Sequence, residues 1–181
     1  MKRYLFITMA LLTSGVSSAQ AEDIKVYVGT GVGAFGLEYK EPGLRQKNTV
    51  LGGFVKLGVD INEYVGAEIR FGATGKGDQT YPAAMIIGAV ADTRVKQSIS
   101  SFASYLLKLQ YPVASDMRLY AMLGGTTAKY KQTYNPGNGT IGSGQSTRKS
   151  GFSYGVGGEY YVNDKISVGI EWMKYWTDVN L

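Results

Sequence analysis

Apolar and polar residues alternate with a period of two over several parts of this chain. After Tyr64, the apolar positions are Val65, Ala67, Ile69, Phe71 and Ala73. The positions between them hold small or charged residues, namely Gly66, Glu68, Arg70, Gly72 and Thr74. Strict alternation of this kind is typical of a β-strand with one apolar and one polar face. The pattern therefore predicts a strand over residues 64–74.

The same alternation recurs in other segments, and the links between the segments differ in length. Further strands are predicted over residues 25–35, 51–60, 103–111, 119–125, 151–162 and 166–173. The short links are residues 61–63, 112–116 and 163–164, and the long links are residues 40–48, 75–96 and 132–150. Because short and long links alternate, all short turns would lie at one end of an up-and-down antiparallel β-barrel.

The first residues have the order of a secretory signal peptide. Lys2 and Arg3 precede an apolar run over residues 4–12, and Ala19-Gln20-Ala21 fits a cleavage site. The run is shorter than the roughly twenty residues of a membrane-spanning helix. A buried core helix is the alternative, but the order of the three parts favours secretion. The sequence thus predicts a signal peptide over residues 1–21 and one mature domain over residues 22–181.

Composition excludes several kinds of chemistry. The 181 residues include no histidine and no cysteine. Without histidine there is no imidazole base or metal ligand, and without cysteine there is no disulfide or thiolate nucleophile. The formal net charge of +5 falls by two when Lys2 and Arg3 leave with the signal peptide. So small an excess does not indicate a nucleic-acid partner.

The two faces of the predicted strands have different residues. The polar faces carry charges of both signs: Lys56, Asp60, Glu68, Arg70, Lys108, Glu159 and Glu171. The apolar faces carry the aromatic residues Phe71, Tyr105, Tyr111, Tyr154, Tyr160 and Trp172. An eight-stranded barrel has a narrow interior filled by side chains, whereas Lys or Arg facing lipid costs about 2–4 kcal/mol at the bilayer midplane. We therefore expect the charges inside and the aromatic residues facing lipid, rather than the reversed faces of a soluble barrel.

Three segments carry a resemblance to a known family. They are residues 60–70, 105–112 and 154–172, which combine the alternation with the short turns. They resemble the small outer-membrane β-barrel family of OmpA-like, OmpX-like and opacity-type porin-family proteins. The resemblance implies an all-β, eight-stranded transmembrane barrel in the outer membrane of a Gram-negative bacterium. It also implies insertion by the barrel assembly machinery and loops displayed outward.

The predicted strand count departs from this family. Only seven segments alternate clearly, and the chain ends at Leu181 without the aromatic residue that usually closes such barrels. An unpaired strand edge in lipid costs several kcal/mol for each unsatisfied backbone group. The favoured explanation is a fragment without its closing strand. The alternatives are closure by another chain or a further strand over Ala83–Val90.

The candidate chemistry is weak. Glu68, Glu159 and Glu171 could be paired carboxylates for acid–base work, but an interior salt-bridge network with Arg70, Lys56 and Lys108 is the favoured interpretation. The glycine-rich stretch over residues 29–33 lacks the following helix of a nucleotide-binding motif. The sequence therefore predicts no catalytic residue, no metal and no cofactor.

The function predicted from these patterns is a non-enzymatic outer-membrane protein, structural or surface-adhesive, with a plugged interior. The alternatives are a small-solute pore and, more weakly, a soluble periplasmic lipocalin-like carrier. The expected partners are membrane lipid, lipopolysaccharide, and a host or neighbouring surface protein bound through the long loops. Basic residues near those loops are candidate lipopolysaccharide contacts: Lys76, Arg94, Lys96, Arg148 and Lys149.

Overall fold

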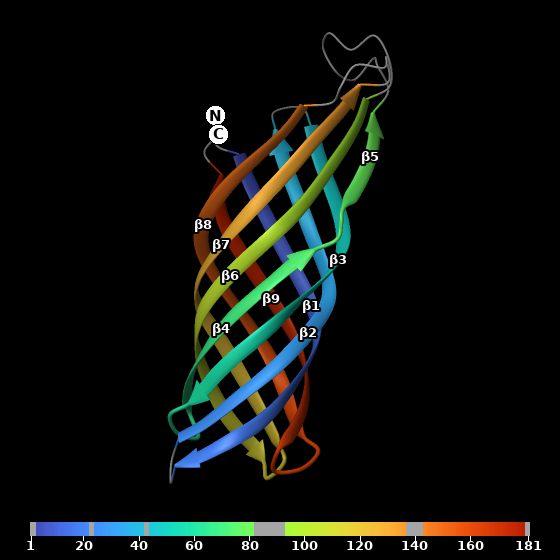
Figure 1. Cartoon of the computed structure of the whole chain (residues 1–181). Helices are drawn as coiled ribbons and strands as arrows, with labels where there is room; N and C mark the ends of the chain where they lie inside the picture. The colour runs from blue at the N-terminus through green and yellow to red at the C-terminus, as the bar shows by residue number, and fades with distance from the viewer. Residues whose placement is uncertain (1–2, 22–23, 42–43, 82–92, 137–142, 180–181) are drawn as a thin grey trace.

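The alternating segments form long antiparallel strands in the computed structural model of the chain (Figure 1). The structure describes the backbone of residues 3–21, 24–41, 44–81, 93–136 and 143–179, and the side chains of residues 24–36, 49–77, 96, 98–131, 133 and 146–175. The strands are β1 (Arg3–Ala21), β2 (Ile24–Glu41), β3 (Leu44–Asp60), β4 (Val65–Thr74), β5 (Gly77–Tyr81), β6 (Thr93–Ala114), β7 (Met117–Pro136), β8 (Ser143–Tyr161) and β9 (Ile166–Val179).

Apart from β4 and β5, strands that are consecutive in the chain pair with each other, and the pairing closes around the barrel. The order is β4-β3-β2-β1-β9-β8-β7-β6-β5, and β4 also pairs with β6. Because β4 and β5 follow each other along the same edge of β6, they share one place in the wall. The described strands thus occupy eight places, which confirms the predicted all-β, up-and-down architecture.

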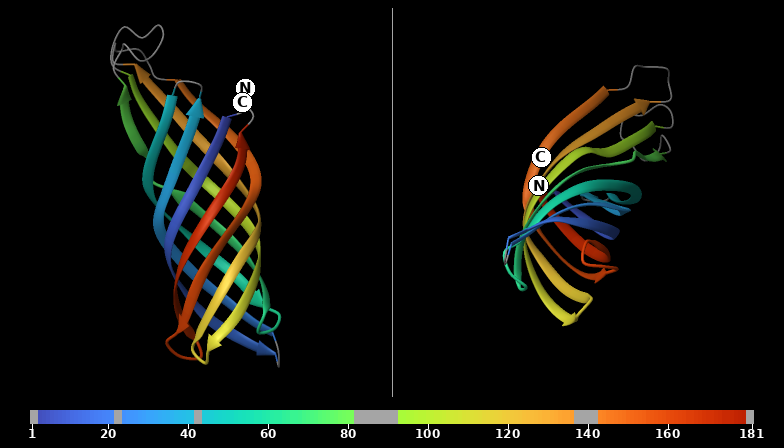
Figure 2. Two further views of the ribbon diagram at one scale, coloured as in Figure 1. Left: turned by 180° about the vertical axis from the view of Figure 1, so that it is seen from behind. Right: turned by 60° about the horizontal axis from the view of Figure 1, so that its bottom comes forward.

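Strand β1 is the segment that the sequence predicts as a signal peptide. Its backbone pairs with β2 on one side and with β9 on the other (Figure 2, left, blue beside red). The seven segments predicted from alternation lie in β2, β3, β4, β6, β7, β8 and β9, so β1 takes the eighth place. The structure holds the uncleaved chain, and cleavage after Ala21 stays a prediction.

The short turns gather at one end of the barrel, at the bottom of Figure 1. Two of them have the same construction. The side-chain Oδ1 of Asn62 accepts hydrogen bonds from the backbone N–H of Tyr64 and of Val65, each at 2.8 Å. Asn163 Oδ1 accepts from Lys165 and Ile166 at 2.9 and 2.8 Å. Asparagine thus closes both turns by the local hydrogen bonds that favour it there.

The opposite end differs from the sequence prediction. The long link predicted over residues 40–48 is wrong, because β2 continues to Glu41 and β3 begins at Leu44. The other two predicted long links are partly strand: β5 and the start of β6 occupy one, and the end of β7 and the start of β8 occupy the other. The candidate strand Ala83–Val90 lies outside the described residues.

Six of the nine described strands are much longer than a membrane crossing requires. A transmembrane β-strand needs about 9–11 residues, whereas β6 has 22 and β7 has 20. Among the described side chains, the large exposed apolar residues lie in the part nearer the short turns, for example from Phe152 to Val162. We call this part the apolar band. Beyond it, the exposed side chains on β7 and β8 are polar, and we call that part the upper extension: residues 127–136 and 143–150 of these strands.

No helix in the described part of the chain is long and apolar enough to cross a membrane.

Candidate functional site: the buried charge network and the outer face

The inward positions of the apolar band hold the charged residues that the sequence assigns to the interior. All seven are buried: Lys56, Asp60, Glu68, Arg70, Lys108, Glu159 and Glu171. They come from β3, β4, β6, β8 and β9, where they alternate with outward apolar residues. The two-residue period of a strand therefore brings them from all sides of the barrel into one volume.

Arg70 lies at the centre of this volume, with no exposed surface. Its Nε donates to Glu68 on the same strand, and its two terminal nitrogens donate to Glu171, one of them to Oε2 at 2.7 Å. Since β4 and β9 lie on opposite sides of the eight-place ring, the Arg70–Glu171 pair crosses the lumen. A bidentate pair of this kind is among the strongest hydrogen-bonded contacts in proteins.

Two tyrosines complete the contacts of these carboxylates. The Tyr27 hydroxyl donates to Glu68 Oε2 at 2.8 Å, and the Tyr120 hydroxyl donates to Glu171 Oε2 at 3.0 Å. Lys56 Nζ lies 3.8 Å from Glu68 Oε2. Neither tyrosine could be predicted from the sequence, because the partners of both are distant along the chain.

A second group of charges lies nearer the short turns. Lys108 Nζ donates to Glu159 Oε2 at 3.2 Å and lies 3.8 Å from Asp60 Oδ1. Ser167 donates to Glu159 Oε1 at 2.6 Å. Arg118 Nη1 lies 3.5 Å from Asp60 Oδ2. This arginine is a further member of the group that was not predicted from the sequence.

Together the two groups balance their charge. The cations are Lys56, Arg70, Lys108 and Arg118, and the carboxylates are Asp60, Glu68, Glu159 and Glu171. Every carboxylate contacts at least one cation. A balanced network offsets the desolvation of charges that would otherwise be costly to bury.

Aromatic rings fill the space that glycines leave on the interior face. A Cβ on Gly58 would lie 2.1 Å from Cζ of Tyr27, and a Cβ on Gly157 would lie 2.4 Å from Cζ of Tyr120. Only glycine therefore leaves room for each ring over the neighbouring strand.

An apolar cluster lies above the charges, toward the upper extension. It includes Phe35, Phe102 and Tyr175, and the Phe102 ring lies 5.9 Å from each of the other two rings. Between this cluster and the charges, Ser104, Thr126 and Ser153 share hydroxyl hydrogen bonds across three strands.

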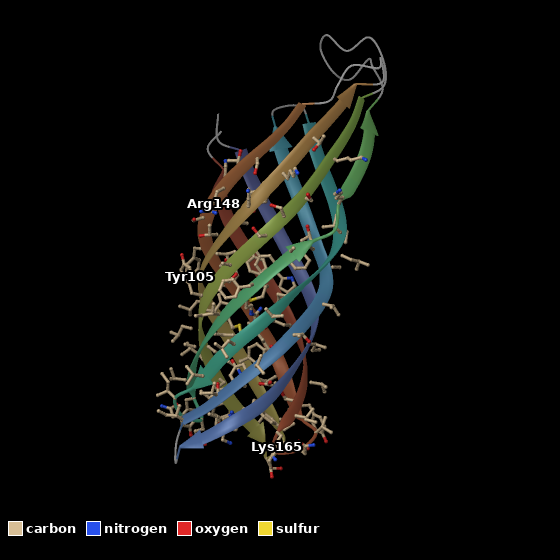
Figure 3. The ribbon with its side chains drawn as sticks, in the orientation of Figure 1. Tyr105, Arg148 and Lys165 are labelled. Carbon is tan, nitrogen blue, oxygen red and sulfur yellow. The ribbon has the colours of Figure 1, made fainter. Side chains whose placement is uncertain are left out.

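The outer face carries the predicted aromatic residues. All six are exposed: Phe71, Tyr105, Tyr111, Tyr154, Tyr160 and Trp172. Tyr154 and Trp172 meet edge to face with ring centroids 6.2 Å apart. Tyr105 lies on the outside of the wall in Figure 3.

The basic residues predicted as lipopolysaccharide contacts are not brought together as one set. Lys76 and Arg148 are exposed, Lys96 and Lys149 are partly buried, and the side chain of Arg94 lies outside the described residues. Instead, Arg148 pairs in register with Lys129 on β7, and both are exposed beside exposed Lys131. The alternation of β7, continued past Gly125, places Lys129 and Lys131 on the outer face, so the sequence did contain this signal.

These features define a class of protein. A closed antiparallel barrel with an apolar outer band, exposed aromatic residues and a polar interior is a transmembrane β-barrel. The chain belongs to the outer membrane protein beta-barrel domain family, whose model it matches over residues 6–180.

Solved structures and curated proteins complete the comparison. The chain is similar to Ail, the attachment invasion locus protein of Yersinia pestis, in complex with the heparin analogue sucrose octasulfate, with 13% identity, 97% of each chain covered and a TM-score of 0.41. A second Ail structure, without that compound in its description, has 12% identity, the same coverage of both chains and a TM-score of 0.40. No curated protein matches the chain.

Proposed function

We propose that the protein is a non-enzymatic, structural or surface-adhesive barrel of the outer membrane, with an interior closed by its own side chains. The observation that carries this proposal is the balanced network of four cations and four carboxylates across the lumen. Its charged groups contact one another, which leaves them poorly placed to activate a substrate.

Two further features support a closed interior. The Arg70–Glu171 pair joins opposite walls, and the Phe35–Phe102–Tyr175 cluster stands between the charges and the upper extension. Eight-stranded barrels have interiors just wide enough for side chains, whereas open aqueous channels occur with about sixteen strands. A solute would have to displace both layers to pass.

A small-solute pore is the alternative. It is favoured by two buried acceptors that have no hydrogen-bond partner among the described residues, Asp60 Oδ1 and Gln110 Oε1. Both belong to inward positions near the short turns, where water entering from that end could reach them. The pore would require a path past Arg70 as well.

Single-channel recording in planar bilayers separates the two functions. We expect no conductance steps from the folded protein, whose folding is verified by a shift in gel mobility on boiling. A larger porin serves as the positive control. Steady, reproducible steps would instead establish the pore, and recovery in the soluble periplasmic fraction would favour the lipocalin-like carrier.

Contact with lipopolysaccharide is the proposed role of Lys129, Lys131 and Arg148. These exposed cations lie two or three outward positions above Phe152, where the apolar band gives way to polar residues. Phosphate groups at the membrane surface would meet them there, and each such contact weakens with added salt.

Charge reversal tests this contact. The double variant Lys129→Glu/Arg148→Glu should retain less lipopolysaccharide on purification than the parent. Lys165→Glu is the matched control, because Lys165 is exposed at the short-turn end (Figure 3). Equal retention in the parent and both variants would refute the contact.

Export and surface partners belong to the same proposal. We propose that residues 1–21 are removed on export, and that β2 and β9, which then lose β1 between them, pair with each other or with a strand of another chain when the assembly machinery inserts the barrel. We also expect a host or neighbouring protein to bind at the long-loop end. Intact-mass measurement of the outer-membrane form tests the first point, since a mass that includes residues 1–21 contradicts cleavage.

A further inference from the structure

Strand β1 occupies one place in the wall, between β2 and β9 (Figure 2, left). It pairs antiparallel with both neighbours, from Leu5 to Ala21 with β2 and from Arg3 to Val16 with β9. Since both are antiparallel to β1, β2 and β9 run parallel to each other. Removal of residues 1–21 belongs to the proposed function, on which the present inference rests. It leaves the edges of β2 and β9 roughly 10 Å apart, the sum of two strand spacings.

The buried network opposes direct pairing of these two edges. The Tyr27 hydroxyl of β2 donates to Glu68, and Glu171 of β9 accepts from Arg70. Glu68 and Arg70 are successive inward residues of β4, which lies opposite β9 and two places from β2. Both edges are thus tied to β4 through the lumen. Bringing β9 against β2 would break these contacts and narrow an interior that side chains already fill.

A second copy of the chain does not supply a suitable strand. Without β1, the free edges of the described strands in the apolar band are those of β2 and β9, and both run in the same direction along the barrel axis. Two copies inserted into the same membrane share that direction, so every pairing between these edges would be parallel. The place of β1 requires the opposite direction and a strand whose two edges are both free.

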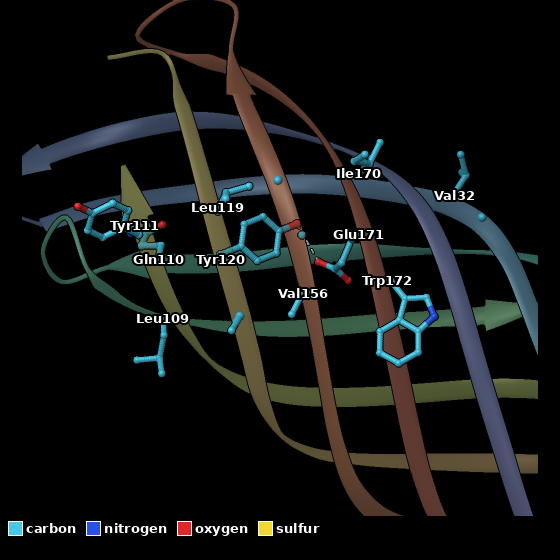
Figure 4. A pocket seen from close by; sticks show the side chains of 14 residues that line it. Val32, Leu109, Gln110, Tyr111, Leu119, Tyr120, Val156, Ile170, Glu171 and Trp172 are labelled. Atoms are coloured by element: carbon cyan, nitrogen blue, oxygen red, sulfur yellow. Dashed lines mark hydrogen bonds between the residues drawn. The ribbon is translucent and has the colours of Figure 1, made fainter. Parts of the chain in front are cut away.

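The residues beside this place define the side chains that suit it. On the outer face, Val32 and Ile170 are exposed and both pair with Leu12 (Figure 4). On the inner face, Phe35 and Met173 flank another position of β1 and belong to the apolar cluster. Nearer the short turns, the inner neighbours are small: Gly29, Gly31, Ser167 and Gly169. A fitting strand is therefore apolar on its outward positions, small on its inward positions near the short turns, and apolar inward beside the cluster.

We propose that, after cleavage, this place holds an extended segment of a second, different polypeptide, which adds between β2 and β9 as a strand antiparallel to both. Strand addition of this kind pairs the backbone groups of an exposed sheet edge. In lipid, where unpaired backbone groups are costly, it closes the wall without moving the buried network. The partner is recognised by its direction, its two free edges and its alternating pattern.

A peptide with the sequence of residues 3–18 is the probe, because that sequence pairs with both edges in the structure. The outer-membrane form is isolated from cells that express the whole chain, and its mass is measured. It is then purified in urea and refolded in micelles with or without the peptide. We expect the shift in gel mobility on boiling to require the peptide. The same peptide with Leu11→Pro is the matched control and should not restore the shift, because proline interrupts a central strand.

Disulfide cross-linking tests the place and register of the peptide. The chain has no cysteine, so an introduced pair reports alone. With Leu12→Cys in the peptide, we expect disulfides both with Val32→Cys on β2 and with Ile170→Cys on β9. Directly paired residues have Cα atoms about 4.5–5.5 Å apart, within the range that a disulfide spans. Cross-linking to both strands requires the peptide to lie between them.

Val28→Cys is the matched control for these variants. Val28 is also exposed on β2, but it pairs with Val16, so it should not cross-link to cysteine at position 12. Should Val32→Cys fail to fold, Thr30→Cys with Ser14→Cys in the peptide tests the same edge two residues away.

Several results would overturn the proposal. A mobility shift without the peptide, or a disulfide within Val32→Cys/Ile170→Cys alone, would show that β2 and β9 pair directly. A disulfide-linked dimer of either single variant would assign the place to a second copy, and cross-linking to one edge alone would put the peptide outside the wall. A mass that includes residues 1–21 would mean that β1 keeps its own place. Only this last result contradicts the proposed cleavage, so the two proposals fail distinguishably.

Discussion

The apolar band and the upper extension of β8 show how one strand meets two solvents. In the band, exposed Phe152, Tyr154 and Val156 alternate with inward Ser153, Gly155 and Gly157. In the extension, Ser146, Arg148 and Ser150 are exposed on the same outer face. The β7–β8 register runs through both parts without a shift. The backbone pairing of β7 and β8 is therefore the same in both parts, and only the polarity of the outward side chains changes with the surrounding solvent.

The two parts also differ in what fixes their cross-section. In the band, Arg70 and Lys108 join strands across the lumen. At the upper limit of the band, Gly75 N–H donates to Leu51 O at 2.7 Å, and above this point the described part of β3 pairs with β2 alone. A register shift between Ile99 and Ser101 lies at the same height on β6. We therefore expect substitutions in the band to cost more than comparable ones in the extension.

The largest expected effect is that of Arg70→Ala. It leaves Glu68 and Glu171 buried without their main cation, and breaking a buried ion pair in this way costs about 3–5 kcal/mol. Urea unfolding in micelles, followed by tryptophan fluorescence, measures the loss. Arg148→Ala in the extension should change the free energy of unfolding by less than about 0.5 kcal/mol. Equal losses in the two variants would remove the distinction between the parts.

A charge on the outer face should locate the boundary of the band. Val156→Arg puts a cation in the middle of the apolar band and should cost about 2–4 kcal/mol. Ser146→Arg makes a comparable change on the same face of the extension, where water already surrounds the side chain. The unfolding free energy in phospholipid vesicles tests both. A similar cost at both positions would mean that lipid extends above Ser150.

Gly157 and Gly158 are adjacent on β8, but Gly157 faces the interior and Gly158 faces outward, so substituting each one tests a different face. Gly157→Ala should destabilise the barrel by about 1–3 kcal/mol by overpacking against Tyr120, whose hydroxyl is held by Glu171. Gly158→Ala should be neutral or slightly stabilising, because its Cβ has room and alanine loses less backbone entropy on folding. Comparing the two midpoints of unfolding makes each variant the control for the other. A larger loss at Gly158 would contradict the assigned faces.

Alternation predicted the faces of the band because lipid and a filled interior demand opposite residues there. It gives no strand signal over residues 40–48, where polar residues occupy successive positions although β2 and β3 extend into the segment. Where both faces of a strand can be polar, the sequence shows no two-residue alternation of apolar and polar residues. The Tyr27–Glu68 and Tyr120–Glu171 contacts could not be predicted either, since they depend on which strands face each other across the lumen. The high glycine content is evident in the sequence, but the contacts of Gly58 with the Tyr27 ring and of Gly157 with the Tyr120 ring are not.

The smallest expected effect lies at the short-turn end, outside the band. Asn62→Ala removes the acceptor of two backbone N–H groups, which water can then reach, so the cost should be about 0.5–1.5 kcal/mol. Asn62→Asp keeps an acceptor oxygen in the same place and should retain most of the stability. Urea midpoints of the three proteins measure the difference. If Asn62→Asp lost as much as Asn62→Ala, the turn would owe its stability to the amide N–H₂ rather than to the accepted hydrogen bonds.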